Sequence, residues 1–187
     1  MRIIGGYLKN KKIFFPTDKF TRPLKDMVRE SIFNIIEHST LIKCKIKNSN
    51  ILDLFSGSGS FGFECMSRGA AKVDFCENYE PAVELLKKNI LNFNCKNNSS
   101  LNNQKVIDFL ENIEKFKIQY DIIFLDPPYR EEKIKSLLEL IFIKKIFKKN
   151  SLIILHRNKK TKDNFPDNFK VLTYRIYGIS KIYFGTF

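Results

Sequence analysis

From residue 50 onward, short apolar runs alternate with amphipathic segments of helical length. The runs that predict strands are 50–55, 72–77, 120–126 and 151–157, with a weaker strand inside 97–104. The segments that predict helices are 59–69, 80–93, 106–116 and 131–147. Strands and helices that alternate in this way form a mostly parallel sheet covered by helices on both faces. We therefore expect an α/β fold.

The two ends of the chain add smaller elements to this sheet. Residues 1–15 alternate loosely around Gly5-Gly6 and predict a short hairpin or arm. Residues 21–38 predict a helix, because Val28, Ile32 and Ile36 recur at helical spacing. Residues 169–187 predict two β segments around Gly178, which would close the sheet with an antiparallel edge. We expect an arm at 1–20 and a single domain at 21–187.

The composition is that of a globular domain with a basic surface. Lys and Arg number 33 against 20 Asp and Glu, a net charge of +13, and 43% of the residues are hydrophobic. This imbalance favours a polyanionic partner, either a nucleic acid or an anionic membrane surface. The chain is also rich in Lys, Asn, Ile and Phe throughout, a bias that raises the charge without selection for binding. Charge alone therefore does not identify the partner.

The sequence predicts neither a membrane span nor a targeting signal. No window of about 18 uninterrupted apolar residues occurs. The N-terminus lacks the apolar segment and cleavage site of a signal peptide. The four cysteines form no C-x-x-C pair, so we expect reduced, partly buried thiols and no metal site. We expect a cytoplasmic monomer that does not associate with membranes.

A glycine-rich stretch, Gly57-x-Gly59-x-x-Gly62, joins the first predicted strand to the following helix. Glycines at such a turn let the backbone bend sharply and approach a ligand closely. Glu77 ends the next strand about 20 residues later, where an acid can accept hydrogen bonds from the ribose hydroxyls of an adenosine. The pattern fits NAD as well as S-adenosylmethionine, and a purely structural turn is the alternative.

Asp53 favours the second of these cofactors. It lies in the strand just before the glycine turn. A dinucleotide would place its pyrophosphate on the following helix N-terminus, where a nearby carboxylate repels it. S-adenosylmethionine carries no phosphate, and its ammonium and sulfonium groups are attracted to a negative site. Asp53 is therefore easier to explain with S-adenosylmethionine.

The tetrapeptide Asp126-Pro127-Pro128-Tyr129 follows a buried strand and so falls at the same sheet edge as the glycine turn. The exocyclic amino group of a base is a poor nucleophile, because its lone pair is delocalised into the ring. The Asp126 carboxylate and the Pro127 carbonyl can accept its two N–H bonds and orient the lone pair for attack. The prolines stiffen this arrangement, and Tyr129 can stack on the base. The alternative is a proline-stiffened surface turn.

Five stretches together resemble the RsmD-type family of 16S ribosomal RNA guanine-N2 methyltransferases. They are "RIIGGYLKNKKI", "TRPLKDMVRESIFNII", "ILDLFSGSGSFGFECMSRGA", "FCENYEPAVELLKKNI" and "IIFLDPPY". The resemblance implies a Rossmann-like class I S-adenosylmethionine-dependent fold, with a mostly parallel seven-stranded sheet, an antiparallel C-terminal edge and an N-terminal β-hairpin. It also implies methyl transfer to the N2 of a guanine in 16S rRNA, within the 30S subunit or an assembly intermediate.

The residues expected to act fall into three groups. We expect catalysis from Asp126, Pro127, Pro128 and Tyr129. We expect cofactor contacts from Asp53, Phe55, Gly57, Gly59, Glu77, Asn78 and Gln104. We expect RNA contacts from Arg2, Arg22, Lys25 and Arg29, for which a solvated helix face is the alternative. Relatives carry Asp or Asn near the adenine where this chain has Lys105, so Gln104 or a backbone amide would replace that contact.

Two other functions stay open at this stage. An adenine-N6 or other amino-methyltransferase acting on DNA or RNA would share the tetrapeptide chemistry. A non-catalytic RNA-binding or ribosome-assembly module would keep the fold, although it would not need the glycine turn, Glu77 and the tetrapeptide together. An NAD-dependent dehydrogenase is disfavoured, because nothing resembles its catalytic groups.

Overall fold

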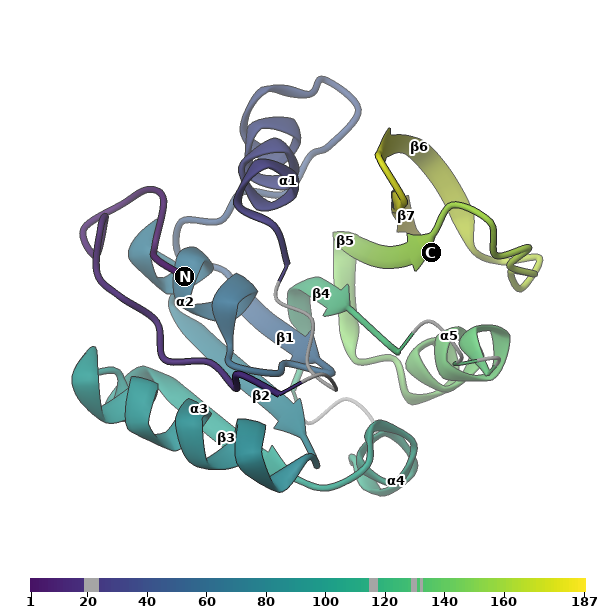
Figure 1. The fold of residues 1–187 in the computed structure, drawn as a ribbon. Coiled ribbons are helices and arrows are strands. Elements are labelled where there is room, and N and C mark those ends of the chain that lie inside the picture. Colours follow the sequence, from purple (N-terminus) through teal and green to yellow (C-terminus); the bar gives the residue numbers. More distant parts are fainter. Residues whose placement is uncertain (19–23, 115–117, 129–130, 132) are drawn as a thin grey trace.

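A single seven-stranded sheet organises the chain. A computed structural model describes residues 1–18, 24–114, 118–128, 131 and 133–187 (Figure 1). The strands are β1 (Asn50–Leu54), β2 (Lys72–Glu77), β3 (Ser99–Asn103), β4 (Tyr120–Leu125), β5 (Phe147–Asn158), β6 (Lys170–Tyr177) and β7 (Ser180–Thr186). They lie in the order β3-β2-β1-β4-β5-β7-β6. The first five strands are parallel, and β7 is antiparallel to β5 and β6, which confirms the predicted fold class.

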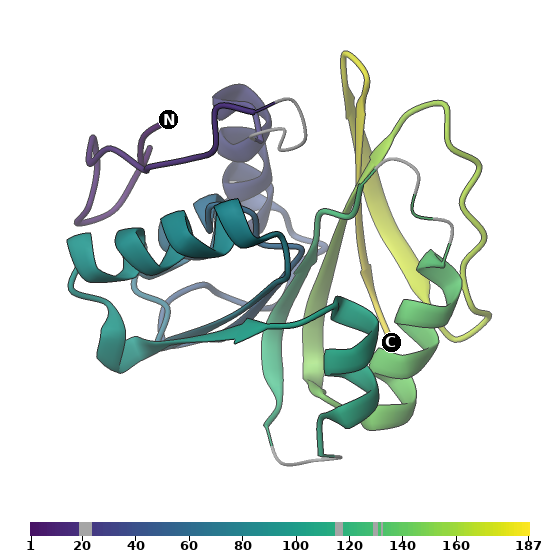
Figure 2. The same ribbon diagram turned by 60° about the horizontal axis from the view of Figure 1, so that its bottom comes forward.

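Helices cover both faces of this sheet, as the alternating pattern predicted. They are α1 (Asp26–His38), α2 (Ser60–Ser67), α3 (Glu80–Asn92), α4 (Val106–Asn112) and α5 (Ile134–Lys144), with the short 3-10 turn η1 (Lys96–Asn98). Figures 1 and 2 show α4 and α5 lying side by side on one face, with α1, α2 and α3 on the other. None of the helices in the described part of the chain is long and apolar enough to span a bilayer.

Alternation along the strands separates two hydrophobic cores. Ile51, Ile122 and Phe124 face α1, α2 and α3, where Phe61 stacks on Phe124 with ring centroids 4.1 Å apart. Their neighbours Leu52 and Ile123 face α4 and α5. Because successive strand residues point to opposite faces, a strand buried on both sides must be apolar at every position. This explains why the predicted strands read as continuous apolar runs.

The N-terminal arm folds back on itself as a hairpin, as the family resemblance implied, but its ladder is short: the Ile3 amide donates to the Lys11 carbonyl (2.9 Å) and the Ile13 amide to the Met1 carbonyl (3.0 Å). Its described part contains one isolated antiparallel bridge, between Arg2 and Lys12, rather than two strands. The Tyr7 amide instead donates to the Ser67 carbonyl on α2 (2.8 Å). Backbone groups that bond to α2 cannot also extend a hairpin ladder. Ile3, Leu8 and Ile13 of the arm are buried in the main core, while the division at residue 20 stays a prediction.

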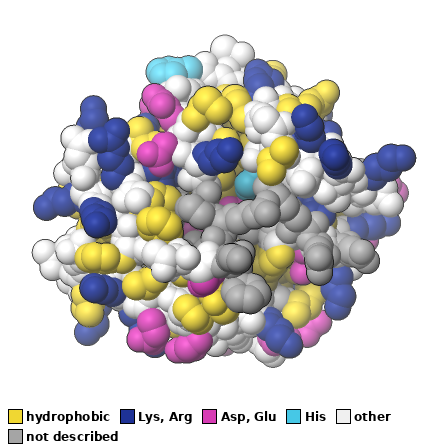
Figure 3. Space-filling model, in the orientation of Figure 1, with side chains coloured by type: hydrophobic (Ala, Val, Ile, Leu, Met, Phe, Trp, Pro, Cys, Tyr) yellow, Lys and Arg dark blue, Asp and Glu magenta, His cyan; other side chains and the backbone are white. Residues whose placement is uncertain are grey.

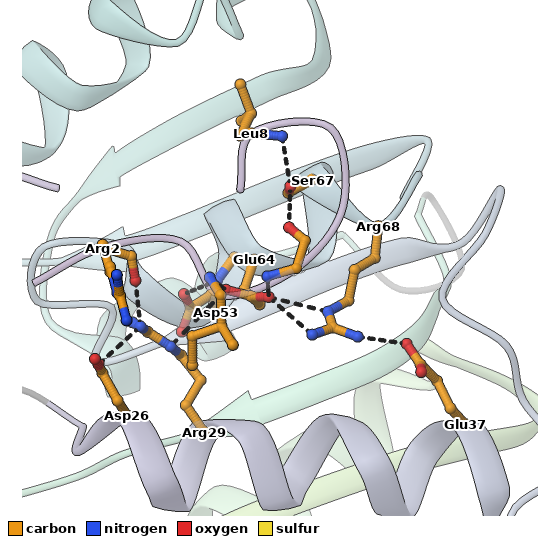
Figure 4. Close-up of polar contacts among 12 residues, drawn as sticks. Arg2, Leu8, Asp26, Arg29, Glu37, Asp53, Glu64, Ser67 and Arg68 are labelled. Atoms are coloured by element: carbon orange, nitrogen blue, oxygen red, sulfur yellow. Dashed lines mark hydrogen bonds and ion pairs between the residues drawn. The ribbon is translucent and has the colours of Figure 1, made fainter. Parts of the chain in front are cut away.

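Glu64 of α2 holds this arm in place. Its Oε2 accepts a hydrogen bond from the Ile4 amide and its Oε1 one from the Gly5 amide, each 2.7 Å long. The same carboxylate forms an ion pair with Arg68 (3.0 Å) and lies 3.9 Å from the Arg29 guanidinium (Figure 4). The Glu64 carboxylate thus connects the backbone of the arm to Arg29 and Arg68 beneath it, so Glu64 is a structural anchor for the arm.

Arg29 is a correction to the sequence analysis, which placed it on an exposed RNA-binding face of the first helix. Its side chain is fully buried, pairs with Asp26 (3.0 Å) and donates to the Arg2 carbonyl. Burial lowers the pKa of Arg29, and the carboxylates of Glu64 and Asp26 oppose that shift. A guanidinium enclosed by these partners cannot reach a phosphate, so Arg29 joins α1 to the arm.

Candidate functional site

A cleft of about 1080 Å³ opens where the strand order reverses, between β1 and β4. Ligands of open α/β sheets bind outside the carboxyl ends of the strands at such a reversal. The glycine turn follows β1 and the tetrapeptide follows β4, and the last residues of these strands, Leu54 and Leu125, are paired. The Asp126 amide also donates to the Leu54 carbonyl (3.3 Å). The two predicted motifs therefore share one wall of the cleft.

The glycine turn takes three residues into the left-handed region of backbone conformation. Phe55, Gly57 and Gly59 have φ of 59°, 55° and 80°. Ser56 fixes the turn, because its hydroxyl donates to the Asp53 and Cys76 carbonyls (2.5 and 3.1 Å). Phe55 and Gly57 line the cleft, and their contact with a cofactor stays a prediction. A non-glycine residue at positive φ stores strain, which is typical of functional loops.

Gly59 and Asp53 lie behind the wall of the cleft rather than on its surface. A Cβ on Gly59 would lie 2.5 Å from Leu86 and 2.6 Å from Phe63, so glycine is needed there for packing. Asp53 is buried, and its Oδ2 accepts a hydrogen bond from the Gly62 amide at the start of α2 (3.0 Å). Both residues shape the turn from beneath, and direct contact with a cofactor stays a prediction for each.

Asp53 also makes the site favourable for a cation. Burial raises the pKa of Asp53 well above its ordinary value, the Gly62 hydrogen bond opposes the shift, and the charges of Asp126 and Glu77 increase it. Three carboxylates that repel one another at one sheet edge are relieved by a positive ligand. The electrostatics therefore fit a sulfonium and an ammonium better than a pyrophosphate.

Glu77 lies at the end of β2 with its carboxylate held by the backbone. Oε1 accepts the amides of Asn78 and Tyr79 (2.8 Å each), and Oε2 accepts the Gly57 amide (2.7 Å). A carboxylate offers about four acceptor positions, so one position on Oε2 remains for a ligand hydroxyl. Glu77 and Asn78 both line the cleft, where the predicted cofactor contacts would have to be made.

Gln104 does not line the cleft, in contrast to its predicted place beside the adenine. Its backbone follows the edge strand β3, and its carbonyl accepts from the Cys76 thiol (3.5 Å). The next three residues, Lys105, Val106 and Ile107, form this part of the wall. The chain turns into α4 at Lys105, which exposes these residues to the cleft instead. A contact between the adenine and a backbone amide, the alternative to Gln104 that the sequence offered, stays a prediction.

The tetrapeptide lines the cleft with its described residues, Asp126, Pro127 and Pro128. Asp126 is partly exposed, Pro127 is buried and Pro128 is exposed. The Pro128 carbonyl accepts from the Glu131 amide (2.8 Å), which closes a turn after the prolines. Tyr129 lies outside the described residues. The carboxylate and the adjoining backbone are therefore presented to the cleft at the end of β4.

Two residues at the end of β5, His156 and Arg157, were missed by the sequence analysis. The Nδ1 of His156 lies 2.7 Å from Oδ1 of Asp126. The guanidinium of Arg157 is buried, pairs with Asp163 (2.7 Å) and donates to the Glu131 carbonyl (2.8 Å). Their position at the end of the predicted parallel strand 151–157 was a usable signal, because all such strand ends meet at one edge.

The predicted RNA-binding residues are placed differently from one another. Lys25 is exposed and lines the cleft, and Arg2 is exposed on the arm. Arg22 lies outside the described residues. Figure 3 shows Lys and Arg side chains spread around the margin of one face, with Asp and Glu among them. On this face the basic charge is not gathered into one continuous strip.

The described residues give no indication of a metal ligand set. No group of three or more His, Cys, Asp or Glu side chains among them could hold a metal ion. The four cysteines are free thiols, and burial raises the pKa of Cys76 to about 12, with Glu77 adding to the shift. These thiols are therefore protonated at neutral pH and poor metal ligands.

Several proteins that are similar to this chain in sequence are named as methyltransferases. A family model described as "Conserved hypothetical protein 95" matches residues 1–186. Ribosomal RNA small subunit methyltransferase D of Buchnera aphidicola (Acyrthosiphon pisum) is 35% identical over 93% of this chain and 86% of its own. The protein of the same name from Haemophilus influenzae is 32% identical over 96% of this chain and 90% of its own. The resemblance stated from the sequence is thereby confirmed.

A solved structure supports the fold independently. "Putative methyltransferase yhhF" from Escherichia coli superposes with a TM-score of 0.83 and 25% sequence identity, over 99% of this chain and 96% of its own. The match extends over the arm, the sheet and the antiparallel edge. The architecture around the cleft is thus shared across nearly the full length of both chains.

Proposed function

Because the chain belongs to the family described as conserved hypothetical protein 95, whose relatives include ribosomal RNA small subunit methyltransferases D, we propose that it methylates rRNA. The methyl group comes from S-adenosylmethionine, and the acceptor is the exocyclic N2 of a guanine in 16S rRNA. The observation that carries this proposal is the pairing of the glycine turn and the tetrapeptide at one cleft. One motif can hold the methyl donor and the other an amino group.

The cofactor half of the cleft suits S-adenosylmethionine, which supplies a methyl group activated by a positive sulfur. Glu77 offers its remaining acceptor position to a ribose hydroxyl. Phe55, Gly57 and Asn78 form the adjoining wall, and Lys105 to Ile107 bound the adenine side. Burial raises the pKa of Asp53 beneath the turn, and a positive ligand above it would favour its ionised form. Together these groups orient the donor toward Asp126.

The acceptor half positions the amino group rather than attacking it. The Asp126 carboxylate and the Pro127 carbonyl accept hydrogen bonds from the two N–H groups, so the nitrogen lone pair points at the methyl group. The new nitrogen–carbon bond replaces the sulfur–methyl bond of the donor, and the nitrogen releases one of its two protons to the Asp126 carboxylate. Fixed acceptors lower the barrier because they need no reorganisation during the reaction. Tyr129 would stack on the guanine, and Pro128 would stiffen the turn.

The arm and α1 would guide the RNA to the cleft. Lys25 lies on the cleft wall, and Arg2 and Arg22 belong to the same N-terminal region. Contacts of this kind reach phosphates and fix the register of the substrate. We propose that the substrate is 16S rRNA in the 30S subunit or an assembly intermediate, and that the enzyme acts as a cytoplasmic monomer.

The Glu77→Gln variant is expected to bind S-adenosylmethionine about 10- to 100-fold more weakly. Hydrogen bonds to an ionised group contribute about 1.5–3 kcal/mol, and the amide also presents N–H groups to the amides that Glu77 now accepts. Isothermal titration calorimetry measures the change. Glu84→Gln is the matched control, because Glu84 is exposed on α3 and forms an ion pair with Lys87 (2.7 Å) away from the cleft. If the two variants bind S-adenosylmethionine with equal affinity, Glu77 does not contact the cofactor.

Methyl incorporation tests the activity itself. The protein is incubated with tritiated S-adenosylmethionine and three acceptors: 30S subunits lacking the modification, naked 16S rRNA and duplex DNA. We expect label in at least one rRNA sample and none in DNA. Label confined to DNA would replace the proposal with a DNA amino-methyltransferase. Cofactor binding without transfer to any acceptor would leave a non-catalytic module instead.

A further inference from the structure

We propose that His156 is a positioning residue that fixes the carboxylate of Asp126, and that Ser180 orients the imidazole from its far side. The inference rests on the proposed function, in which Asp126 holds the amino group of the acceptor base. It assigns a role to the end of β5 and to β7, the antiparallel strand between β5 and β6, neither of which carries a predicted site residue. His156 acts through Asp126 and is not itself placed on the reacting atoms.

Three side chains from three strand ends form a continuous hydrogen-bonded line. Nδ1 of His156 lies 2.7 Å from Oδ1 of Asp126, and Nε2 lies 2.9 Å from the Ser180 hydroxyl. The imidazole is buried, with 8% of its side chain exposed, whereas 23% of the Asp126 side chain is exposed to the cleft. All three residues line the cleft. The Asp126 carboxylate is thus held at Oδ1 by His156, while part of its side chain remains exposed to the cleft.

The chemistry of these partners determines which nitrogen carries the proton. An ionised carboxylate only accepts hydrogen bonds, so Nδ1 of His156 must be the donor to Asp126. The other nitrogen, Nε2, accepts from the Ser180 hydroxyl when the ring is neutral, or donates to it when the ring is charged. Ser180 satisfies both forms because a hydroxyl can donate or accept. The Nδ1–H donor is therefore present in either state.

Asp126 needs such a partner because of its surroundings. The charge of Asp126 interacts unfavourably with the carboxylate of Asp53. A partly exposed Asp side chain can rotate to another rotamer, away from such a neighbour. A hydrogen bond to Oδ1 removes that freedom and leaves Oδ2 to accept an N–H bond of the base. Positioning of this kind lowers the activation barrier without changing how tightly the cofactor binds.

A buried histidine with two partners could also serve stability alone, so the test must separate the two roles. Two isosteric replacements do this. Asn carries its amide nitrogen one bond from Cγ, like Nδ1, and so keeps a donor to Asp126. Gln carries its amide nitrogen two bonds from Cγ, like Nε2, and so keeps only the contact with Ser180. His38→Gln is the matched control, since 77% of the His38 side chain is exposed at the end of α1.

Single-turnover methylation of 16S rRNA, with S-adenosylmethionine saturating, gives the expected result directly. We expect the rate in His156→Gln to fall roughly 10- to 100-fold, as for loss of a hydrogen bond to a charged group. We expect His156→Asn to recover most of that loss, and His38→Gln to match the wild type. Cofactor affinity should be unchanged in all three variants. Equal rates in the Asn and Gln variants, or a loss that follows cofactor affinity, would overturn the positioning role.

Nitrogen NMR on the wild-type protein tests the contact without any variant of His156. The chain has two histidines, so their ring signals can be separated, with His38→Gln giving the assignment. In the wild type we expect Nδ1 of His156 to carry a proton. In Asp126→Ala we expect the ring proton to lose its preference for Nδ1 over Nε2. An unprotonated Nδ1 of His156 in the wild type would overturn the proposal. If the wild type does not methylate RNA, the proposed function fails, and the NMR result still decides whether His156 holds Asp126.

Discussion

Asp126→Ala is expected to lower the rate of methyl transfer by about 10²- to 10³-fold, the usual cost of removing one preorganised polar group from a reacting centre. The affinity for S-adenosylmethionine should change little, because the groups that line the cofactor half of the cleft remain in place. Asp126 lies on the acceptor side, where its carboxylate is held by His156. The effect should therefore appear in the transfer step and not in cofactor binding.

Two measurements on the same variant check this expectation. Single-turnover transfer to 16S rRNA gives the rate, and isothermal titration calorimetry gives the cofactor affinity. Asp167→Ala serves as the matched control, because Asp167 is exposed in the loop before β6. A collapse of cofactor affinity in Asp126→Ala would show that Asp126 binds the donor. Transfer at the wild-type rate would remove Asp126 from catalysis altogether.

Glu64→Ala is expected to destabilise the fold by about 3–5 kcal/mol, the range for removing one partner of a buried ion pair. The variant removes one of the two carboxylates beside the buried Arg29 guanidinium, breaks the ion pair with Arg68 and frees the amides of Ile4 and Gly5. Since whole domains are stable by only about 5–15 kcal/mol, this loss is a large part of the total. The arm should also detach from α2.

Urea denaturation measures this loss of stability. Glu37→Ala is the control, because Glu37 is partly exposed and pairs with the other face of the Arg68 guanidinium (2.6 Å). Exposed pairs of that kind contribute less than about 1 kcal/mol. A cost below about 1 kcal/mol for Glu64→Ala would mean that Glu64 does not anchor the arm. If the variant cannot be purified folded, Glu64→Gln, which keeps the acceptor oxygen, should still show a reduced midpoint.

The order of strands and helices was predictable because it depends on local patterns. Every predicted strand from residue 50 onward is present, including the weak one at 99–103. The meeting of Gly57 and Asp126 at one edge was also predictable, since parallel strands end at the same side of a sheet. The expected helix 131–147 is shorter, because Lys145 adopts a left-handed conformation and Phe147 pairs with Tyr120 at the start of β5.

The missed contacts depend on tertiary register instead. Arg29 was assigned to the exposed face because it is charged, yet Ile32 and Phe33, its neighbours one turn later, are buried with it. Its partner Glu64 is on another helix, and no local pattern connects the two. His156 and Asp126 are likewise brought together only by the pairing of β4 with β5. Side-chain partners across elements require the assembled fold.

Identification of the methylated nucleoside tests the central claim most directly. 30S subunits that lack the modification are incubated with the protein and isotope-labelled S-adenosylmethionine, and the 16S rRNA is digested to nucleosides for mass spectrometry. We predict that the label appears in N2-methylguanosine, and that it is absent with Asp126→Ala. Label in N6-methyladenosine, or none in any nucleoside while the cofactor binds, would contradict guanine-N2 methylation by this chain.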